Sequence, residues 1–527
     1  MLKNYIYLSM LKGVVFVFEQ KTRLLLLFVS LGFLSACAIK RPQGTAVVNS
    51  RHQEQGESPD PELQETLKTK AMLKRQKDSV LVFKKNLWAD SSRTAHPQWL
   101  DSLYKQHGYQ PFLTSQDAPR TMIILEYLRN AVLHGLDTNY FYLNEIGPRL
   151  RDFEKEKAKE KDQEEQAAKP AKYREQLKLE LLMAAALLKY SEAMQYGLIR
   201  PDSLDKNYFI KTPAHDSSTI MRVFSATDLR FFLDSIQPAA PAYRSLQKAL
   251  QANKGTINRN KEDAAKTIKL NLERMRWRNQ PDAQKKYVWV NIPDFTLKVI
   301  EKGASILEMK VCVGEGRTDT DPGSKETPQL NSMIYSVQVN PIWNIPTSIA
   351  RKEISRYASN DPYYLSNNDI DVYKGGKRIS SPEKLDWDTI DVGQYTFKQR
   401  PGEQNSLGKI KFIFNNNSSV YLHDTPARSA FKKKGRAISH GCVRVEKPME
   451  LALALFGPGK TYDQIKTAME RSYPRAKYIG LPAKVPVYLT YITAWVDDQD
   501  LLQIRNDIYK LDELLYQEMK AREMISE

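Results

Sequence analysis

Cysteine is scarce in this chain, with only Cys37, Cys312 and Cys442 among 527 residues. Three cysteines so far apart offer neither a disulfide framework nor the CxxC ligand pairs of a structural metal site, so each must be explained singly. Long hydrophobic runs are also lacking: the run from Leu24 to Leu34 has eleven residues, too few to span about 30 Å of hydrocarbon alone. No repeat of solenoid period is found. Small disulfide-rich, polytopic membrane and solenoid proteins are therefore excluded.

The composition is that of a globular protein with a basic surface. The net charge is +17, with 27% charged and 41% hydrophobic residues, so the chain can bury a core and is long enough for two or three domains. A positive balance suits any polyanion, including nucleic acid, an anionic cell wall or a membrane surface. The charge alone leaves the partner open.

The N-terminal residues indicate an exported protein. Lys21-Thr22-Arg23 precedes the apolar run, which ends in Leu34-Ser-Ala-Cys37, and this order favours a signal peptide over residues 1–36. The ending resembles the lipobox of bacterial lipoproteins, in which the cysteine is acylated and becomes the first mature residue. The polar residues 37–80 then predict a lipidated flexible tether. The alternatives are an uncleaved membrane anchor and a buried free cysteine in a short apolar helix.

The residue after the lipobox cysteine bears on the location. Ala38 stands there instead of aspartate, which resembles lipoproteins sorted to the outer membrane of Gram-negative bacteria. The expected location is the periplasm, with the protein attached to that membrane. The expected partner at this end of the chain is the membrane, reached through the lipid anchor.

The periodicity of apolar residues predicts an α+β architecture. From 81 to 285 they recur at helical spacing, as in Met122, Leu125 and Leu128, and His107-Gly108, His134-Gly135 and Tyr196-Gly197 mark helix ends. From 286 to 496 short β-branched runs predict a β-rich domain. Further strands are predicted at Gly408–Phe414, Val420–His423 and Val487–Trp495. The polar helical pattern near the end of the chain predicts a C-terminal helix over 497–527. Residues 347–392 are polar and turn-rich, which indicates an inserted cap.

The most informative stretch places His423, His440 and Cys442 within twenty residues. A thiol attacks a carbonyl as a thiolate, so it needs an imidazole base and backbone N–H groups for the oxyanion. Gly441 lets the backbone approach a substrate closely. Cys442 also precedes an apolar helical pattern, which predicts that a helix dipole favours its thiolate. These residues indicate a cysteine acyl-transfer site whose substrate is open.

The cysteines and histidines also allow other interpretations. Cys312 lies in an apolar strand pattern and is expected to be a small buried hydrophobic residue. His423, His440 and Cys442 could bind zinc with Asp424, but their spacing matches no common zinc pattern, so neither a metal nor a cofactor is expected.

These motifs resemble those of L,D-transpeptidases with a YkuD-type catalytic domain. The resemblance rests on Ser439-His-Gly-Cys-Val-Arg444 and on Tyr421-Leu-His-Asp-Thr-Pro426. It extends to the YcbB-like branch, which has a helical scaffold domain and a capping subdomain. The residues that carry this extension are Gly314, Thr327-Pro328, Asn340–Pro346, Gly402–Gly408 and Asn271–Trp277. That branch often inserts a small peptidoglycan-binding domain before the segment that begins at Asn271. Only 27 residues separate Tyr243 from Asn271 here, so this domain is expected to be absent.

The resemblance implies a mechanism. His423 deprotonates Cys442, which attacks the diaminopimelate carbonyl at position 3 of a tetrapeptide stem and releases the terminal D-Ala. The amine of a second stem then resolves the thioester into a 3→3 crosslink without ATP. A backbone carbonyl, that of Asp424, would orient His423, while the Asp424 side chain remains an alternative. The resemblance also implies that carbapenems acylate Cys442.

The resemblance further suggests which residues meet the substrate. Tyr421 would assist the oxyanion, and His440 would shape the loop. Arg444 would pair either with a stem carboxylate or with the fold's own core, and Trp343 and Asn344 would line the donor cleft or pack in the core. The candidate substrate-binding residues are Tyr421, Asp424, Arg436, Ser439, His440, Arg444, Trp343 and Asn344.

Three other functions compete with transpeptidation. The same thioester resolved by water would give an L,D-carboxypeptidase or a peptidoglycan peptidase, and the sequence does not separate the two acceptors. A wall-binding lipoprotein with a relic site is disfavoured by the presence of both Cys442 and His423. Nucleic-acid binding lacks a recognisable signature and conflicts with export.

Overall fold

The computed structural model describes residues 96–115, 120–160, 170–252, 259–318, 325–471 and 475–525, together with 78, 81, 82, 84 and 85. The expected signal peptide, Cys37 and nearly all of the expected tether lie outside the described residues. Residues 72–527 cluster as one compact unit, and every described residue belongs to it. Within the described ranges, no helix combines the length and the apolarity that crossing a membrane would need.

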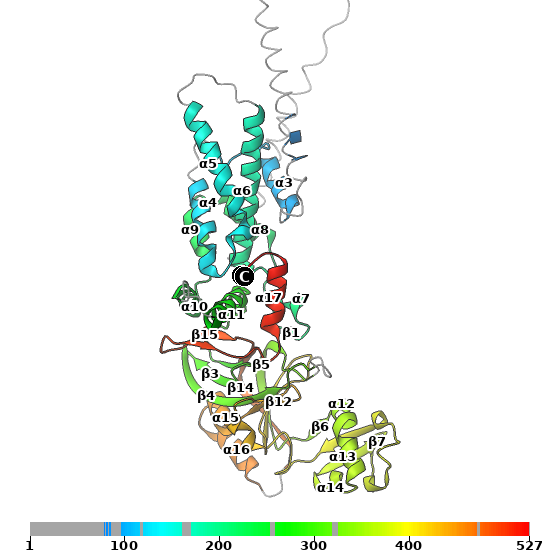
Figure 1. Ribbon diagram of the computed structural model, residues 1–527. Coiled ribbons are helices and arrows are strands. Elements are labelled where there is room, and N and C mark those ends of the chain that lie inside the picture. Colours follow the sequence, from blue (N-terminus) through cyan, green and yellow to red (C-terminus); the bar gives the residue numbers. More distant parts are fainter. Residues whose placement is uncertain are drawn as a thin grey trace, which may run out of the picture. The chain divides into compact units, whose positions relative to one another are not determined.

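The first part of the described chain is helical, as the apolar periodicity predicts (Figure 1). Asp216 and Asp228 cap α8 and α9 by accepting the backbone N–H groups of Ser218 and Phe231. The elements are α3 (Pro97–Gln106), α4 (Arg120–Arg129), η1 (Asn130–His134), η2 (Thr138–Phe141), α5 (Leu143–Glu160), α6 (Pro170–Tyr196), α7 (Pro201–Leu204), β1 (Tyr208–Phe209), α8 (Ser217–Ser225), α9 (Leu229–Ile236), α10 (Pro241–Ala252) and α11 (Arg259–Arg276).

The glycine-marked helix ends are confirmed. Helix α3 stops before His107-Gly108, η1 before Gly135 and α6 before Gly197. Gly135 and Gly197 have φ angles of 76° and 81°, in the left-handed region that closes helices most easily with glycine. A side chain at Gly197 would also come within 2.7 Å of Glu273, so packing requires glycine there as well.

Helix α6 is the centre of the scaffold core. Its residues from Leu177 to Met194 include buried side chains on several faces, which is typical of a helix surrounded by others. The last helix, α17 (Leu511–Ala521), joins the same core through Leu515 and Met519. Figure 1 shows α17 in red beside α11, and the two helices are in contact. The chain therefore returns to the scaffold after the β-rich part.

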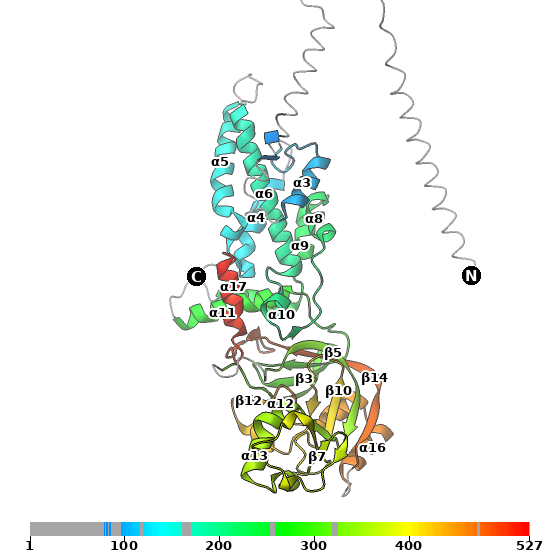
Figure 2. The same cartoon turned by 90° about the vertical axis from the view of Figure 1, so that its right-hand side faces the viewer.

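The β-rich part is a ten-stranded sheet in the order β1-β5-β10-β11-β13-β4-β3-β2-β14, with β12 beside β4. Strand β14 also pairs with β5, so the sheet closes on itself, and Figure 2 shows β5, β10 and β14 side by side. Helices α15 (Pro448–Phe456) and α16 (Lys460–Met469) share its core. The strands are β2 (Tyr287–Asn291), β3 (Thr296–Glu301), β4 (Ala304–Gly314), β5 (Gln329–Val339), β10 (Ile410–Phe414), β11 (Leu422–His423), β12 (Ala437–Ser439), β13 (Val443–Val445) and β14 (Lys477–Thr490).

Polar contacts join the scaffold to this sheet. Asn271 of α11 donates to Thr493 Oγ1 at 2.7 Å and accepts the Thr493 N–H at 3.0 Å, and both residues are buried. Arg317 pairs with Glu326 at 2.8 Å and with Asp205 at 3.5 Å. Strand β1 adds a parallel backbone pairing to β5. The Asn271–Trp277 motif noted in the sequence thus lies at a joint.

The inserted cap is a subdomain with its own core. Its four-stranded sheet has the order β6-β9-β7-β8, and Leu365, Val372 and Phe397 are among its buried residues. The sequence predicts an insertion over 347–392, whereas the cap sheet begins at β6 and ends with β9, so these bounds are corrected. The elements are β6 (Trp343–Ile345), α12 (Thr347–Ile349), the π-turn η3 (Ala350–Ile354), α13 (Ser355–Asn360), α14 (Tyr364–Asn367), β7 (Ile370–Lys374), β8 (Lys377–Arg378), η4 (Pro382–Lys384), η5 (Val392–Gln394) and β9 (Tyr395–Gln399).

Two further expectations near the C-terminus are corrected. The strand expected over 487–495 ends at Thr490, and β15 (Ala494–Val496) pairs with β16 (Leu502–Ile504) as a separate hairpin. The helix expected over 497–527 begins only at Leu511. The hairpin has a reason to form, because Ala494 packs with Leu246 and Leu272 of α10 and α11, a long-range contact that the local polar pattern does not reveal.

Candidate active site

The sheet brings the two main catalytic candidates to one cavity. Strand β11 runs parallel to β13, with His423 opposite Arg444, and Cys442 directly precedes β13. The cavity measures about 560 Å³ and holds both His423 and Cys442 in its wall. Its described lining is Lys325, Trp343, Pro346, Ser348, Ile349, Lys352, Glu353, Ile354, Tyr357, Tyr364, Ser406, Leu407, Ser418, Ser419, Val420, Tyr421, His423, Ser439, His440, Cys442 and Arg444.

Cys442 does not lie at a helix N-terminus, which corrects the sequence expectation. Strand β13 follows it at once, and the apolar helical pattern begins only at Pro448, the first residue of α15. The residues between belong to the sheet because Val443 and Val445 point into its core. The helix dipole is therefore not what stabilises a thiolate here.

Hydrogen bonds hold the loop that carries Cys442. Thr327 Oγ1 donates to the Gly441 carbonyl at 2.8 Å and accepts the Gly314 N–H at 2.8 Å. Ser439 Oγ donates to the Cys442 carbonyl at 2.6 Å and accepts the Gly441 N–H at 3.2 Å. Gly441 has a φ of 108°, which only glycine adopts easily. Gly314 and Thr327, noted in the sequence only by resemblance, thus position the nucleophile loop.

His423 is buried and hydrogen-bonded in a way that sets its tautomer. Its Nδ1 lies 2.5 Å from the Asp424 carbonyl, which can only accept, so Nδ1 carries the proton and Nε2 has the free lone pair. Burial lowers the pKa of His423 to about 3, and the charges of Arg444 and Lys411 act in the same direction. The carbonyls of Asp424 and Leu407 oppose that shift. His423 is therefore a neutral base at ordinary pH.

The Asp424 side chain is used elsewhere. Its Oδ1 accepts from Thr425 N at 2.7 Å and from Arg428 Nη2 at 2.6 Å, and Oδ2 accepts from Lys409 N at 2.8 Å. The sequence left open whether the carbonyl or the carboxylate of Asp424 orients His423, and the carbonyl is the group that contacts the ring. Asp424 is buried outside the described cavity lining.

The Cys442 thiol is half-buried in a site with competing effects on its ionisation. Burial raises its pKa above the ordinary value, while the backbone and hydroxyl of Tyr421 and the charges of Lys411 and Arg444 oppose the rise. Burial and the nearby thiol in turn raise the pKa of Tyr421, so its hydroxyl stays a donor. The Tyr421 ring packs edge-on against His423 at 5.7 Å. The resting pair is thus a neutral thiol and a neutral imidazole.

Arg444 and Lys411 supply positive charge beside this pair. Arg444 lines the cavity, and its buried Nε has no hydrogen-bond partner among the described residues. Lys411 lies opposite His423 in the β10–β11 ladder, and its Nζ is 4.5 Å from the centre of the Tyr421 ring. Sequence reasoning missed Lys411, although its place in the Ile410–Phe414 alternation could have shown that it shares a face with His423.

The remaining candidates fall into two groups. Trp343, Ser439 and His440 line the cavity, and His440 Nε2 lies 2.5 Å from Glu353 Oε1 of the cap. Asn344 is exposed and lies outside the described lining. Arg436 also lies outside it, because its guanidinium donates to the carbonyls of Val311, Phe295 and Lys433. Arg436, Asn344 and Asp424 are thus absent from the described cavity lining, and a substrate-binding role for them stays a prediction.

The remaining sequence predictions concern Cys312 and a possible zinc site. Cys312 is fully buried against Ala430 and Phe431, as its apolar strand predicts, and burial raises its pKa. No group of three or more His, Cys, Asp or Glu side chains suited to a metal is present in the described part of the chain.

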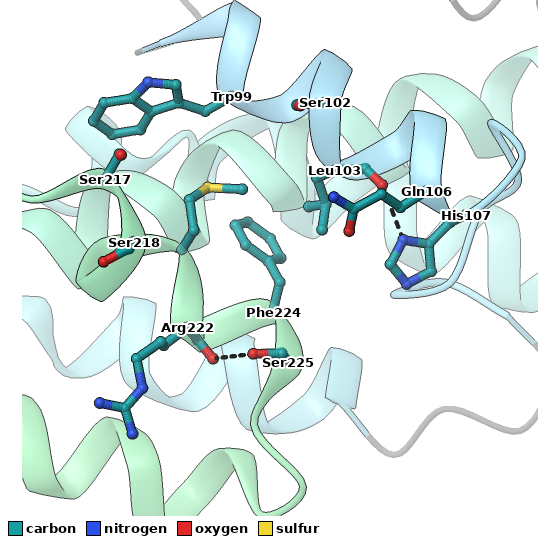
Figure 3. Close-up of a pocket in the computed structure, with 11 residues that line it drawn as sticks. Trp99, Ser102, Leu103, Gln106, His107, Ser217, Ser218, Arg222, Phe224 and Ser225 are labelled. Atoms are coloured by element: carbon teal, nitrogen blue, oxygen red, sulfur yellow. Dashed lines mark hydrogen bonds between the residues drawn. The ribbon is translucent and has the colours of Figure 1, made fainter. Parts of the chain in front are cut away.

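A second hollow lies in the scaffold. It measures about 430 Å³, and Figure 3 shows side chains of α3 and α8, among them Trp99, Ser217 and Phe224, around it. Its described lining contains serines, Gln106, His107 and Arg222 but no cysteine and no carboxylate. His107 Nδ1 donates to the Leu103 carbonyl at 3.0 Å, within its own helix end. The residues that the sequence suggests for acyl transfer, His423 and Cys442, therefore lie in the sheet cavity.

Comparisons with known proteins divide the chain into the same helical and β-rich parts. Residues 285–457 match the model of the L,D-transpeptidase catalytic domain (YkuD), and residues 98–250 match that of a scaffold domain. A curated protein of Haemophilus influenzae named "Putative L,D-transpeptidase" is 32% identical over 308 residues, which are 58% of this chain and 60% of that protein. The match thus spans about 60% of the length of this relative.

Two solved structures show a weaker likeness. One is an L,D-transpeptidase from Mycobacterium smegmatis, at 12% identity, a TM-score of 0.19 and coverage of 39% of this chain and 58% of that one. The other is the Ldtfm-avibactam carbamoyl enzyme, at 11% identity, a TM-score of 0.17 and coverage of 39% of this chain and 49% of that one. TM-scores this low carry no argument about the fold. The two family matches confirm the resemblance seen in the motifs: the chain carries a scaffold domain and an L,D-transpeptidase (YkuD) catalytic domain.

Proposed function

We propose that this chain is a peptidoglycan L,D-transpeptidase that forms 3→3 crosslinks through a thioester on Cys442. The observation that carries the proposal is that one cavity wall holds both Cys442 and a neutral His423 whose Nδ1 donates to the Asp424 carbonyl, which leaves the Nε2 lone pair to accept a proton. This is the arrangement that general-base activation of a thiol requires.

The proposed acylation step uses these two residues. Nε2 of His423 takes the proton of Cys442 Sγ as the sulfur attacks the diaminopimelate carbonyl at position 3 of a tetrapeptide stem. The C–N bond breaks, and D-Ala leaves as an amine after receiving that proton. The thioester keeps the energy of the peptide bond, so no ATP is consumed. Tyr421 and the Cys442 amide stabilise the oxyanion, since the Gly441 amide donates to Ser439 in the resting structure.

Charge selects the donor. A stem peptide carries carboxylates, and Arg444 offers an unpartnered buried Nε among the described residues, close to the positive Lys411. Charge-assisted hydrogen bonds of this kind are stronger than neutral ones. We therefore place a donor carboxylate at Arg444, which favours the substrate-binding alternative for this residue over a purely structural one.

The decisive experiment is mass spectrometry of muropeptides after incubation with purified residues 38–527. We expect 3→3 dimers and free D-Ala, both absent with Cys442→Ala. Tripeptides without dimers, at every donor concentration, would instead assign the chain to the L,D-carboxypeptidases.

We also propose that the protein is a lipoprotein facing the periplasm from the outer membrane. The support is the Leu34-Ser-Ala-Cys37 motif, which lies outside the described residues. Labelling with radioactive palmitate should mark the wild type, and Cys37→Ala should become unlabelled and soluble while keeping its activity. An unlabelled wild type in the soluble fraction would reject this location.

A further inference from the structure

The cavity around Cys442 is positively charged except at one place. Its described lining contains the cations Lys325, Lys352 and Arg444, and Glu353 is the one carboxylate among the described lining residues. Glu353 comes from the cap and lies on the π-turn η3, an irregularity frequently found at functional sites. A lone carboxylate in a basic cavity is the group that would attract a cationic ligand.

Glu353 is tied to the nucleophile loop. Its Oε1 lies 2.5 Å from His440 Nε2, and His440 is two residues before Cys442. Oε1 also lies 4.0 Å from Lys325 Nζ, and Lys325 in turn pairs with Glu315 at 2.9 Å. Both contacts of Glu353 use the same oxygen, so Oε2 remains without a hydrogen-bond partner among the described residues. The side chain is 29% exposed, which leaves it accessible from the cavity.

The second half-reaction needs such a group. An acceptor amine arrives as an ammonium ion with a pKa of about 10.4, as for a lysine side chain, and it cannot attack until it loses a proton. Acylation by the donor has no such requirement, because its nucleophile is the enzyme's own thiol. A carboxylate that binds the ammonium ion beside a proton acceptor would serve the acceptor step alone.

We infer that Glu353 and His440 form the subsite for the acceptor's primary ammonium group. Glu353 binds the ammonium ion. Because His440 Nε2 carries the proton that it donates to Glu353 Oε1, Nδ1 of His440 takes the proton whose loss makes the amine nucleophilic, and it releases that proton to solvent. The amine then forms the C–N bond, the C–S bond of the thioester breaks, and the second amine proton passes through His423 to Cys442 Sγ. The inference rests on the proposed transpeptidase function and names which residues select an amine over water.

The test compares Glu353→Gln with a matched control, Glu315→Gln. Both remove a carboxylate near Lys325, but Glu315 does not belong to the described cavity lining. The acyl-enzyme is formed with a tetrapeptide donor and then offered either a second stem, whose amine is charged, or hydroxylamine, which is uncharged at neutral pH. Dimers, hydroxamates and hydrolysed tripeptides are counted by mass spectrometry.

For Glu353→Gln we expect the dimer-to-tripeptide ratio to fall about tenfold or more, as the loss of one charge-assisted hydrogen bond implies. The yield of hydroxamate should stay within about twofold, since removing Glu353 costs an uncharged nucleophile nothing. Glu315→Gln should match the wild type with both acceptors. Equal losses with both nucleophiles, or an unchanged dimer ratio while the wild type forms dimers, would overturn the inference and leave the proposed function standing. A wild type that forms hydroxamate and tripeptide but never dimers would overturn both.

Discussion

Two buried histidines, one in each main part of the molecule, show what separates a structural residue from a base. His134 of the scaffold and His423 of the catalytic domain both have a pKa lowered to about 3, chiefly by burial and then by arginine charge. His134 Nδ1 is shared by Tyr243 OH at 2.9 Å and Gln247 Nε2 at 3.0 Å, among side chains that close around it. His423 instead faces a cavity that also holds Cys442. A perturbed pKa therefore does not identify a base unless the ring also faces a substrate cavity.

Replacing each histidine should separate their roles most strongly. His423→Gln should lower acylation by about 10²–10⁴-fold, the usual contribution of a general base, without changing the melting temperature much. His134→Gln should keep the acylation rate within about threefold, because its contacts are confined to the scaffold. Stopped-flow acylation by a β-lactam, whose strained carbonyl opens on a thiolate, measures both. Equal rates in the two variants would remove the distinction.

Each of these two histidines has an arginine nearby whose charge lowers its pKa: Arg444 for His423 and Arg276 for His134. Arg276 is fully buried, and its guanidinium donates hydrogen bonds to Glu273, the His134 carbonyl and Tyr243. The Nε of Arg444, by contrast, has no hydrogen-bond partner among the described residues. Arg444→Gln should therefore raise the KM of a tetrapeptide donor by about 10- to 100-fold, the loss of one hydrogen bond to a charged group. Arg444→Lys should recover only part of it, because lysine lacks the planar fork. An unchanged KM in Arg444→Gln would assign Arg444 to the core.

We predict that the cap distinguishes large from small substrates, because its residues line the cavity. Replacing residues 343–399 by a short turn should slow crosslinking of stem peptides by about tenfold or more, through lost positioning, but slow β-lactam acylation less. Rates with both substrates and a thermal melt of the shortened protein provide the check. Equal slowing with the fold intact would mean that the cap supports His423 and Cys442 directly.

Acid should destabilise the fold through both histidines. Between about pH 3 and 6.5 the unfolded chain binds protons at His134 and His423 that the folded chain does not, so the free energy of unfolding falls as the pH falls through this window. Each site contributes up to about 1.4 kcal/mol per pH unit. Urea denaturation at pH 7 and pH 5 should therefore show that His423→Gln loses about 2 kcal/mol less on acidification than the wild type. Equal losses would mean that His423 is not held neutral by the fold.

The sequence predicted the fold class and the shared location of His423 and Cys442 better than the local geometry around them. The alternating apolar strands, the glycine helix stops and the Ser439–Arg444 motif were all readable locally, and they led to the fold class and to the His423–Cys442 pair. The position of Cys442 was misjudged because the apolar helical pattern of Pro448, Leu451 and Leu455 was extended back to Cys442. The helix begins only at Pro448, and β13 pairs with β4 and β11 in between.

The residues that the sequence did not reveal depend on long-range contacts. Glu353 meets His440 across 87 residues of chain, and no spacing or composition connects them. Arg436 and Asp424 looked like substrate-binding groups because they flank the motif, yet their hydrogen bonds turn them toward the protein. A residue's distance in sequence from the proposed nucleophile therefore predicts a substrate contact less well than the face of the strand on which the residue lies.

The central claim, that Cys442 carries the acyl group, is tested most directly by trapping it. The protein is incubated with a disaccharide tetrapeptide, quenched in acid and mapped by peptide mass spectrometry, with Cys312→Ser as the matched control. We expect the mass of the donor less D-Ala on the peptide that contains Cys442, in the wild type and in Cys312→Ser, and no adduct in Cys442→Ala. An adduct on another residue, or continued D-Ala release by Cys442→Ala, would contradict the account.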